Sequence, residues 1–153
     1  TLTAASSSGI SDGAAAVVLM HESTAKARGL KPLARIVAQA SFAQAPEWFT
    51  TAPVGAIRKV LTRAGWQADQ VDLWEVNEAF AVVAMAAMHD IGIDHAKLNV
   101  NGGACALGHP VGATGARIVT TLLHALHAHG KKRGVATLCI GGGEATAIAI
   151  ETC

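Results

Sequence analysis

The chain has 153 residues, of which 51% are hydrophobic and 15% are charged, and its 12 basic and 11 acidic side chains leave a formal net charge of +1. This composition is typical of one globular domain with a hydrophobic core. The near-neutral charge and the 4% aromatic content argue against a nucleic-acid-binding surface, and the longest apolar runs are too short to span a bilayer. We therefore expect neither a nucleic-acid partner nor a membrane partner.

The three cysteines are Cys105, Cys139 and Cys153, and they lie at no spacing typical of zinc ligands. An odd number of cysteines without a signal peptide indicates a reducing, intracellular compartment. The chain opens at "TLTAASSSG", without an initiator methionine, so we expect a fragment of a longer protein.

Strand and helix patterns alternate along the first part of the chain. Residues 14–20, "AAAVVLM", predict a buried strand, and residues 22–29, "ESTAKARG", predict a short helix that ends at a glycine. Residues 33–42, "LARIVAQASF", predict a strand because apolar side chains alternate in its first half. After a loop with two prolines, the second of them, Pro53, marks the start of an amphipathic helix.

The rest of the chain predicts four more strands and two more helices. In chain order they are a strand at 71–76, a helix at 78–92, a strand at 97–101, a helix at 113–129, and strands at 134–143 and 145–151. From residue 33 onward the order is therefore β-α-β-α-β-α-β-β. This order predicts an α/β fold with a mixed, mostly parallel β-sheet and helices packed on its faces.

Polar residues stand at or just after three predicted strand ends, and glycine-rich segments surround or follow two of them. Asn77 follows the strand at 71–76, His109 lies in the glycine-rich turn of residues 101–117, and Cys139 lies near the end of the strand at 134–143. Ligands of open α/β sheets bind beyond the carboxyl ends of the strands, so we expect these side chains to converge. A cysteine, a histidine and an asparagine form a candidate set of nucleophile, base and polariser. The glycines leave backbone N–H groups free to bind a substrate oxygen.

Each of these residues also has a simpler interpretation. A cysteine in an apolar strand is commonly part of the core, a histidine in a loop commonly lies at the surface, and an asparagine after a strand commonly caps a helix. The glycine turn precedes a helix, as phosphate-binding loops do, but it lacks the GK[ST] motif and does not match G-x-G-x-x-G. His124, His127 and His129 have no cysteine or carboxylate close by in sequence. For them we predict a solvated helix face and no metal site.

Four motifs resemble signature blocks of the thiolases, the enzymes that make and cleave 3-ketoacyl-CoA. They are "SSSGISDGAAA" (6–16), "NEAF" (77–80), "NGGACALGHPVGATGAR" (101–117) and "LCIGGGEA" (138–145). The resemblance covers essentially the whole chain and is strongest to the branch of the family that acts on acetyl-CoA. It implies an acyltransferase that condenses two acetyl-CoA molecules to acetoacetyl-CoA or catalyses the reverse thiolysis.

The resemblance also implies a role for each candidate residue. His109 would deprotonate a nucleophilic cysteine, and Cys139 would be the second acid/base, acting at the carbon nucleophile. Asn77 would hold a water that, together with His109 Nε2–H, binds the thioester oxygen. The Gly141 N–H would contribute to a second oxyanion hole. Coenzyme A thioesters are then the substrates, and no metal or redox cofactor is needed.

Three further residues are implied to bind the substrate. Ser8 would hydrogen-bond the pantetheine arm, and Phe80 would line the acyl pocket. Phe49 stands in the substrate loop where a methionine is common in the family, and "GGGEAT" (141–146) replaces a frequent "GGGMG". Because these departures bear on acyl-chain length, a 3-ketoacyl-CoA thiolase for longer chains is an alternative. A catalytically idle, thiolase-like acyl-CoA-binding protein is another alternative. A ketoacyl synthase, which shares the fold but not "NEAF" or "CIGGG", is weaker still, and a nucleotide-binding α/β module is disfavoured because the phosphate motif is missing.

The family's nucleophilic cysteine has no counterpart in this chain, so the resemblance implies an N-terminal half that carries it. Residues 1–30 would be the tail end of the N-terminal half-domain, contributing a strand and a helix, and residues 31–153 would be the C-terminal domain. For the full-length protein the resemblance implies a homo-oligomer in the cytoplasm, with mitochondria and peroxisomes as alternative compartments.

Overall fold

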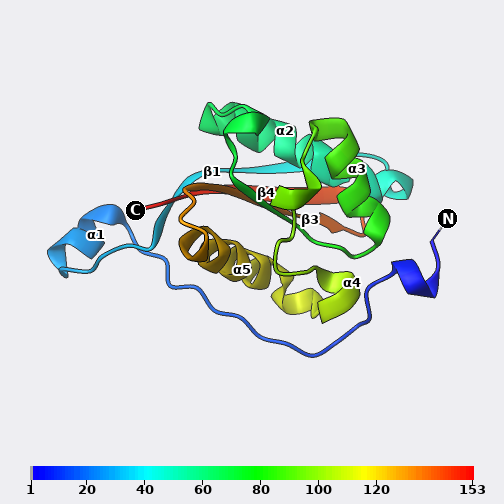
Figure 1. The fold of residues 1–153 in the computed structure, drawn as a ribbon, viewed down its shortest axis with the longest axis horizontal. Coiled ribbons are helices and arrows are strands. Elements are labelled where there is room, and N and C mark those ends of the chain that lie inside the picture. Colours follow the sequence, from blue (N-terminus) through cyan, green and yellow to red (C-terminus); the bar gives the residue numbers. More distant parts are fainter. Residues whose placement is uncertain (1) are drawn as a thin grey trace.

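A four-stranded mixed sheet forms the centre of the structure, a computed structural model that describes residues 2–153. The strands are β1 (Ala34–Ala43), β2 (Leu73–Val76), β3 (Arg133–Ile140) and β4 (Glu144–Thr152). They are arranged in the order β1-β4-β3-β2 (Figure 1). β2 runs parallel to β3, whereas β4 runs antiparallel to both β3 and β1.

The predicted α/β class is confirmed, but the expectation of a mostly parallel sheet is wrong, because only the β2–β3 pair is parallel. The reason lies in the three-residue glycine turn between β3 and β4. Ile140 pairs with Glu144 across this turn, and Gly143 N donates to Ile140 O at 3.1 Å. Gly143 has φ 98°, a conformation that favours glycine. Such a short connection can only join antiparallel strands.

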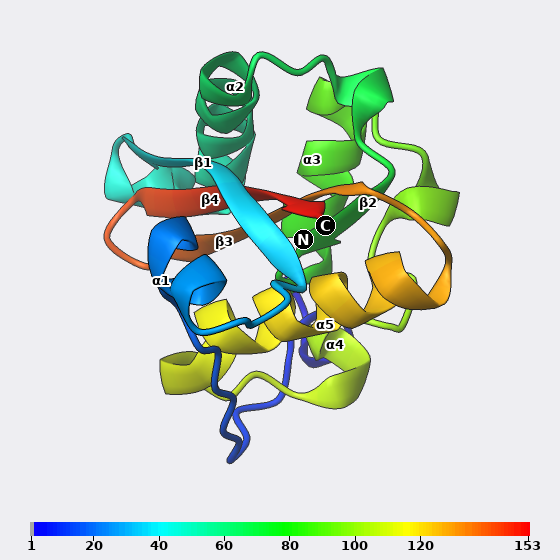
Figure 2. The ribbon, with the colours of Figure 1, turned by 90° about the vertical axis from the view of Figure 1, so that its left-hand side faces the viewer.

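Helices cover both faces of the sheet. α2 (Ala52–Ala64) and α3 (Ala81–Ile91) lie on one face, and α5 (Thr114–Ala128) lies on the other (Figures 1 and 2). The three helices confirm the predictions to within one to three residues at their ends, and α2 has its proline in the first turn, as expected.

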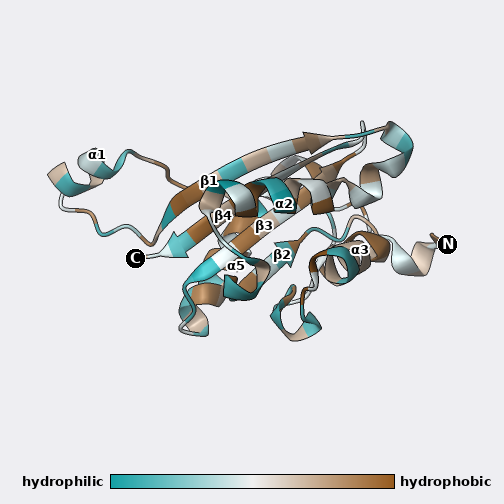
Figure 3. Cartoon of the chain, turned by 90° about the horizontal axis from the view of Figure 1, so that it is seen from above, coloured by the Kyte–Doolittle hydropathy of each residue, from teal (hydrophilic) through white to brown (hydrophobic). Residues whose placement is uncertain are grey.

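The alternation of side chains along the strands creates two separate cores. On β3, Val135 belongs to the core beneath α2 and α3, and the next residue, Ala136, belongs to the core beneath α5. Trp74 and Ile57 are the largest fully buried side chains of the first core, and Leu122 is completely buried in the second. Figure 3 shows the matching pattern, with helices α2 and α5 carrying both hydrophilic and hydrophobic residues.

Two predicted strands are wrong. Residues 14–20 form no regular structure and run along the outside of the molecule, with Val18 86% and Leu19 70% exposed (Figure 1). Within residues 2–153, no other strand pairs with this segment. The predicted strand at 97–101 is reduced to one bridge between Leu98 and Trp74. The chain turns away there because Asn99 adopts φ 47°, a left-handed conformation.

The remaining elements are short. The chain also contains α1 (Glu22–Ala27), α4 (Ala104–Leu107) and the 3₁₀ turns Ala4–Ser6, Pro46–Thr51, Ala68–Gln70, His95–Lys97 and Val111–Ala113. Helix α1 confirms the short helix predicted at 22–29, and the loop predicted after β1 contains the turn Pro46–Thr51. Among the described residues, no helix has the length and apolarity needed to cross a bilayer.

Candidate active site

Three segments that are far apart in sequence meet just beyond the end of β2. Ser8 N donates to Ala79 O at 3.1 Å, which brings the N-terminal segment against the residues that follow β2. His109 N donates to Gly9 O at 2.8 Å, which ties the glycine turn to the same segment. The Nδ2 atom of Asn77 lies 3.5 Å from Nε2 of His109. Three of the sequence motifs therefore meet at one place.

Asn77 is placed by the sheet itself. Its backbone N–H donates to Thr137 O at 3.0 Å and so extends the parallel pairing of β2 and β3 by one residue. Its side chain is buried, and its Oδ1 accepts a hydrogen bond from Arg117 Nη2 at 3.4 Å. The simpler interpretation as a helix cap does not apply, because α3 begins at Ala81 and is preceded by Phe80.

His109 is held at both ring nitrogens. Its Nδ1 lies 2.9 Å from Thr114 Oγ1 in the first turn of α5, and its Nε2 faces Asn77. The side chain is half-buried. Burial lowers the pKa of His109 below its ordinary value, and the nearby Arg117 cation lowers it further. The imidazole is therefore neutral near pH 7, as a general base must be.

The carboxylate of Glu78 organises the glycine turn, which sequence reasoning missed. Its Oε1 accepts from Asn99 Nδ2 at 2.8 Å, and its Oε2 accepts from Cys105 N at 3.2 Å. A Cβ on Gly103 would overlap this carboxylate, so the turn needs a glycine there. Asn99 also pairs with Val76 N and O through its side chain, at 2.8 and 2.9 Å. These side-chain bonds take the place of the strand pairing that was predicted at 97–101.

A buried ion pair lies behind Asn77 and was also missed. Glu75 on β2 is 2% exposed, and its Oε2 lies 3.5 Å from Arg117 Nη1 on α5. Burial raises the pKa of Glu75 to about 7; Arg117 opposes this rise and Glu78 adds to it. The sequence signal was a glutamate in the middle of the otherwise apolar strand "LWEV".

Cys139 and Gly141 lie at the same edge of the sheet as Asn77. The parallel strands β2 and β3 end at this edge: Val76 pairs with Thr137, and Cys139 follows Thr137 by two residues. The Cys139 side chain packs against the core beneath α2 and α3, and burial raises the pKa of its thiol. Gly141 is exposed in the β3–β4 turn. Within residues 2–153, no hydrogen bond joins Cys139 or Gly141 to the Asn77–His109 pair.

The three candidate substrate-binding residues flank this edge. Phe49 and Phe80 contact each other edge to face, with ring centroids 5.9 Å apart. Ser8 lies beside them, because its hydroxyl donates to Ala79 O at 3.0 Å and its neighbour Ser7 bridges to Phe80. The structure therefore groups Asn77 with His109, and Phe49 with Phe80.

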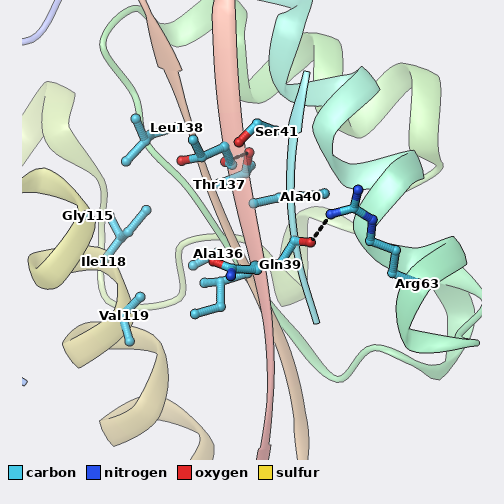
Figure 4. Close-up of a pocket in the computed structure, with 13 residues that line it drawn as sticks. Gln39, Ala40, Ser41, Arg63, Gly115, Ile118, Val119, Ala136, Thr137 and Leu138 are labelled. Atoms are coloured by element: carbon cyan, nitrogen blue, oxygen red, sulfur yellow. Dashed lines mark hydrogen bonds between the residues drawn. The ribbon is translucent and has the colours of Figure 1, made fainter. Parts of the chain in front are cut away.

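Two hollows lie away from these residues. The hollow in Figure 4 measures about 530 Å³ and lies on the sheet beside α5, lined by residues of β1, β3 and β4 such as Ser41, Leu138 and Ile148. Arg63 Nη1 closes one side by donating to Gln39 O at 2.6 Å. The other hollow, about 520 Å³, lies where α2 and α3 end. Neither of these two hollows is lined by a candidate catalytic residue.

The part of the chain that the structure describes contains no cluster of three or more histidine, cysteine or carboxylate side chains that could hold a metal ion. In the run that includes His124, His127 and His129, the His127 ring lies 3.1 Å from Leu33 O.

Comparisons with known proteins agree with the motifs. A family model described as "Thiolase, C-terminal domain" matches residues 30–152. The chain is 56% identical over 151 residues to a probable acetyl-CoA acetyltransferase of Dictyostelium discoideum, and it covers 36% of that relative. It is 55% identical to an acetyl-CoA acetyltransferase of Escherichia coli K12 and 50% identical to the cytosolic one of Mus musculus, covering 38% of each. In all three cases 99% of this chain is aligned.

Solved structures give the same result. The Bacillus anthracis acetyl-CoA acetyltransferase superposes with a TM-score of 0.97 at 45% identity, and human mitochondrial 3-ketoacyl-CoA thiolase in complex with CoA superposes with a TM-score of 0.89 at 38% identity. Each match covers 99% of this chain and 39% of the other. The chain therefore spans somewhat more than a third of the length of these proteins.

Proposed function

Because the chain belongs to the thiolase family, we propose that it is the C-terminal part of an acetyl-CoA C-acetyltransferase. In this proposal it supplies the histidine, cysteine and asparagine of an active site that makes acetoacetyl-CoA from two acetyl-CoA molecules or cleaves it. The observation that carries the proposal is the contact between Asn77 and a neutral His109 at the edge of the sheet where β3 brings Cys139.

The first half-reaction forms an acyl-enzyme. His109 Nε2 takes the proton from a cysteine thiol of the N-terminal half, and the thiolate forms a bond to the carbonyl carbon of acetyl-CoA. The C–S bond to coenzyme A breaks, and the departing thiolate takes the proton of the Cys139 thiol. The raised pKa of Cys139 supports this step, because the side chain is then a protonated thiol near pH 7 and has a proton to give. The Gly141 N–H stabilises the oxyanion in this half-reaction.

The second half-reaction forms the carbon–carbon bond. The Cys139 thiolate removes a proton from the methyl group of a second acetyl-CoA. The oxygen of the resulting enolate binds to the protonated Nε2 of His109 and to a water held by Asn77. The carbanion attacks the acetyl group, the nucleophilic cysteine leaves, and it recovers its proton from His109. Protons and charges balance, so no metal or redox cofactor is needed.

Substrate binding is assigned to the residues that flank the site. Ser8 meets the pantetheine arm, while Phe80 and Phe49 form the wall next to the acyl group. Their edge-to-face contact supports this assignment, because it joins the two rings into one apolar surface. The alternative is a 3-ketoacyl-CoA thiolase for longer chains, and one neighbour in structure carries that name.

The active site needs an N-terminal half that carries the nucleophile. We assign residues 1–30 to the tail end of that half-domain and residues 31–153 to the C-terminal domain. The exposed apolar side chains of Val18 and Leu19 support this division, because they lack a partner within the described chain. The assembled enzyme is proposed to be a homo-oligomer in the cytoplasm, and the cytosolic relative of Mus musculus supports this compartment.

The test uses the longer protein that contains this chain. We expect it to condense acetyl-CoA and to cleave acetoacetyl-CoA faster than 3-ketooctanoyl-CoA, and we expect His109→Ala to lower kcat/KM about a thousandfold or more. The 153-residue chain alone is expected to be inactive. Preference for the longer substrate would favour the alternative, and turnover of neither substrate would favour a non-catalytic acyl-CoA-binding protein.

A further inference from the structure

We propose that Thr114 and Arg117, with Arg117 anchored by Glu75, are positioning residues that set the orientation of the Asn77 amide and the tautomer of His109. The effect of this positioning on catalysis rests on the function proposed above, whereas the hydrogen-bond arrangement itself does not. The contacts that carry it connect two elements, the end of β2 and the first turn of α5.

The orientation of the Asn77 amide follows from Arg117. A guanidinium group has only donors, so the atom of Asn77 that Arg117 Nη2 contacts at 3.4 Å must be the carbonyl oxygen. The NH2 group of Asn77 is then directed at His109 Nε2, 3.5 Å away. Without Arg117, nothing in these contacts would prevent the amide from rotating by half a turn and placing its oxygen next to His109.

The tautomer of His109 follows from the amide. Because the Asn77 NH2 group donates, Nε2 of the neutral imidazole must accept, and the ring proton lies on Nδ1. That proton is donated to Thr114 Oγ1 at 2.9 Å, and the threonine hydroxyl donates in turn to Pro110 O at 3.2 Å. Every donor in this chain of hydrogen bonds has an acceptor. The arrangement leaves the Nε2 electron pair on the side of the ring where a proton must be taken up.

Glu75 explains why Arg117 stays in place. Its carboxylate is 2% exposed and has no basic partner in its contacts other than Arg117, and its Oε1 makes no hydrogen bond among the described residues. The Arg117 side chain is 19% exposed and spans Glu75 and Asn77 with two different nitrogens, which a lysine could not do. Glu75 is the acidic group that contacts this cation, Glu78 acts on Glu75 by raising its pKa, and His109 is the titratable base whose pKa the cation lowers.

The experiment labels the longer protein with [15N]histidine and records the imidazole nitrogens of His109, assigned by loss of its signals in His109→Gln. We expect a protonated Nδ1 and an unprotonated Nε2 in the wild type at pH 7.5. Thr114→Val is expected to produce a mixture of tautomers and to lower kcat about tenfold or more with little change in KM, and Thr114→Ser is expected to restore both.

Arginine variants separate charge from orientation. Arg117→Met is expected to raise the pKa of His109, because the nearby cation is lost. It is also expected to lower kcat, because the two guanidinium nitrogens that contact Glu75 and Asn77 are lost. Arg117→Lys is expected to keep the pKa low but not to restore kcat, because a single ammonium nitrogen does not reproduce the two separate nitrogens that contact Glu75 and Asn77. Two matched controls remove the same kinds of group elsewhere. Thr120→Val removes a hydroxyl of the same helix that donates to Ala116 O, and Arg58→Met removes a guanidinium that donates to Asp90 O.

The result that overturns the proposal is a proton on Nε2 in the wild type. Loss of kcat in Thr114→Val or Arg117→Met without any change in the His109 signals also overturns it, because the residues are then merely structural. The proposal is also overturned if Thr114→Val and Arg117→Met match the two controls in kcat and in the His109 spectrum. If the wild type shows the expected tautomer but does not turn over acetyl-CoA, the function proposed above fails and the positioning inference stands.

Discussion

Replacing the buried Glu75 by glutamine is expected to remove a large part of the pH dependence of stability. Burial raises the pKa of Glu75 from 4.5 to about 7 in the folded protein, against the opposing effect of Arg117. A carboxyl group with a raised pKa binds its proton more tightly in the folded state than in the unfolded state. Its contribution to the free energy of unfolding is therefore highest below pH 4.5 and is lost as the pH rises to about 7 and beyond.

The size of this loss follows from the difference between the two pKa values. At about 1.4 kcal/mol for each pH unit, it amounts to about 3 kcal/mol. A neutral glutamine has no such titration, so the free energy of unfolding of Glu75→Gln should change less between pH 5 and pH 8 than that of the wild type. The comparison between pH values matters, because a change in packing caused by the substitution itself shifts the variant at both pH values alike.

Urea unfolding can be followed by tryptophan fluorescence, since Trp74 and Trp66 are buried in the core beneath α2 and α3. Glu47→Gln, which removes an exposed carboxylate, is the matched control and should follow the wild-type pH dependence. Parallel curves for Glu75→Gln and the wild type between pH 5 and pH 8 would refute the reasoning, because the carboxyl group would then titrate at its ordinary pKa.

Three other outcomes are expected. Burial and Arg117 lower the pKa of His109, so the acidic limb of the pH profile of kcat/KM should lie below pH 6.5. Arg117→Met should move this limb to higher pH. A limb above pH 6.5 in the wild type would contradict the lowered pKa of His109. Cys139→Ala should still become acetylated by radiolabelled acetyl-CoA, because the departing coenzyme A thiolate can take its proton from water instead, but it should fail at condensation, where no other base removes the methyl proton. Cys139→Ser should also be slow; equal loss of labelling and condensation, or loss of neither, argues against the assigned step. Gly103→Ala should lower the free energy of unfolding by about 1–3 kcal/mol, because its Cβ overlaps the Glu78 carboxylate, and an unchanged urea midpoint would show that the turn can adapt.

The sequence alone was enough to predict the α/β class, the three long helices and the positions of Asn77 and His109. The helices were predictable because their apolar side chains recur with the helical period and because proline and glycine mark their ends. The two polar residues were predictable because Asn77 follows a strand and His109 lies among glycines, at the edge of a sheet where ligands bind. These signals are local, and each can be found in a short segment of the chain.

The tertiary structure decided which segments become strands and how they pair. Residues 14–20 have a strand-like composition, but a strand needs a neighbour, and the described chain offers none. Residues 97–101 lost their strand because the side chain of Asn99 took over the pairing with Val76. β4 runs antiparallel to β3 because three glycines allow the chain to reverse its direction tightly after β3.

The same limit applies to the site. Thr114 and Arg117 lie in the motif of residues 101–117, but nothing in that motif connects them with Glu75, which lies 42 residues before Arg117. They meet because β2 and α5 pack against each other, with Glu75 on the face of β2 that α5 covers. Contacts of this kind depend on the face of the strand and the turn of the helix, which are set only when the two elements dock.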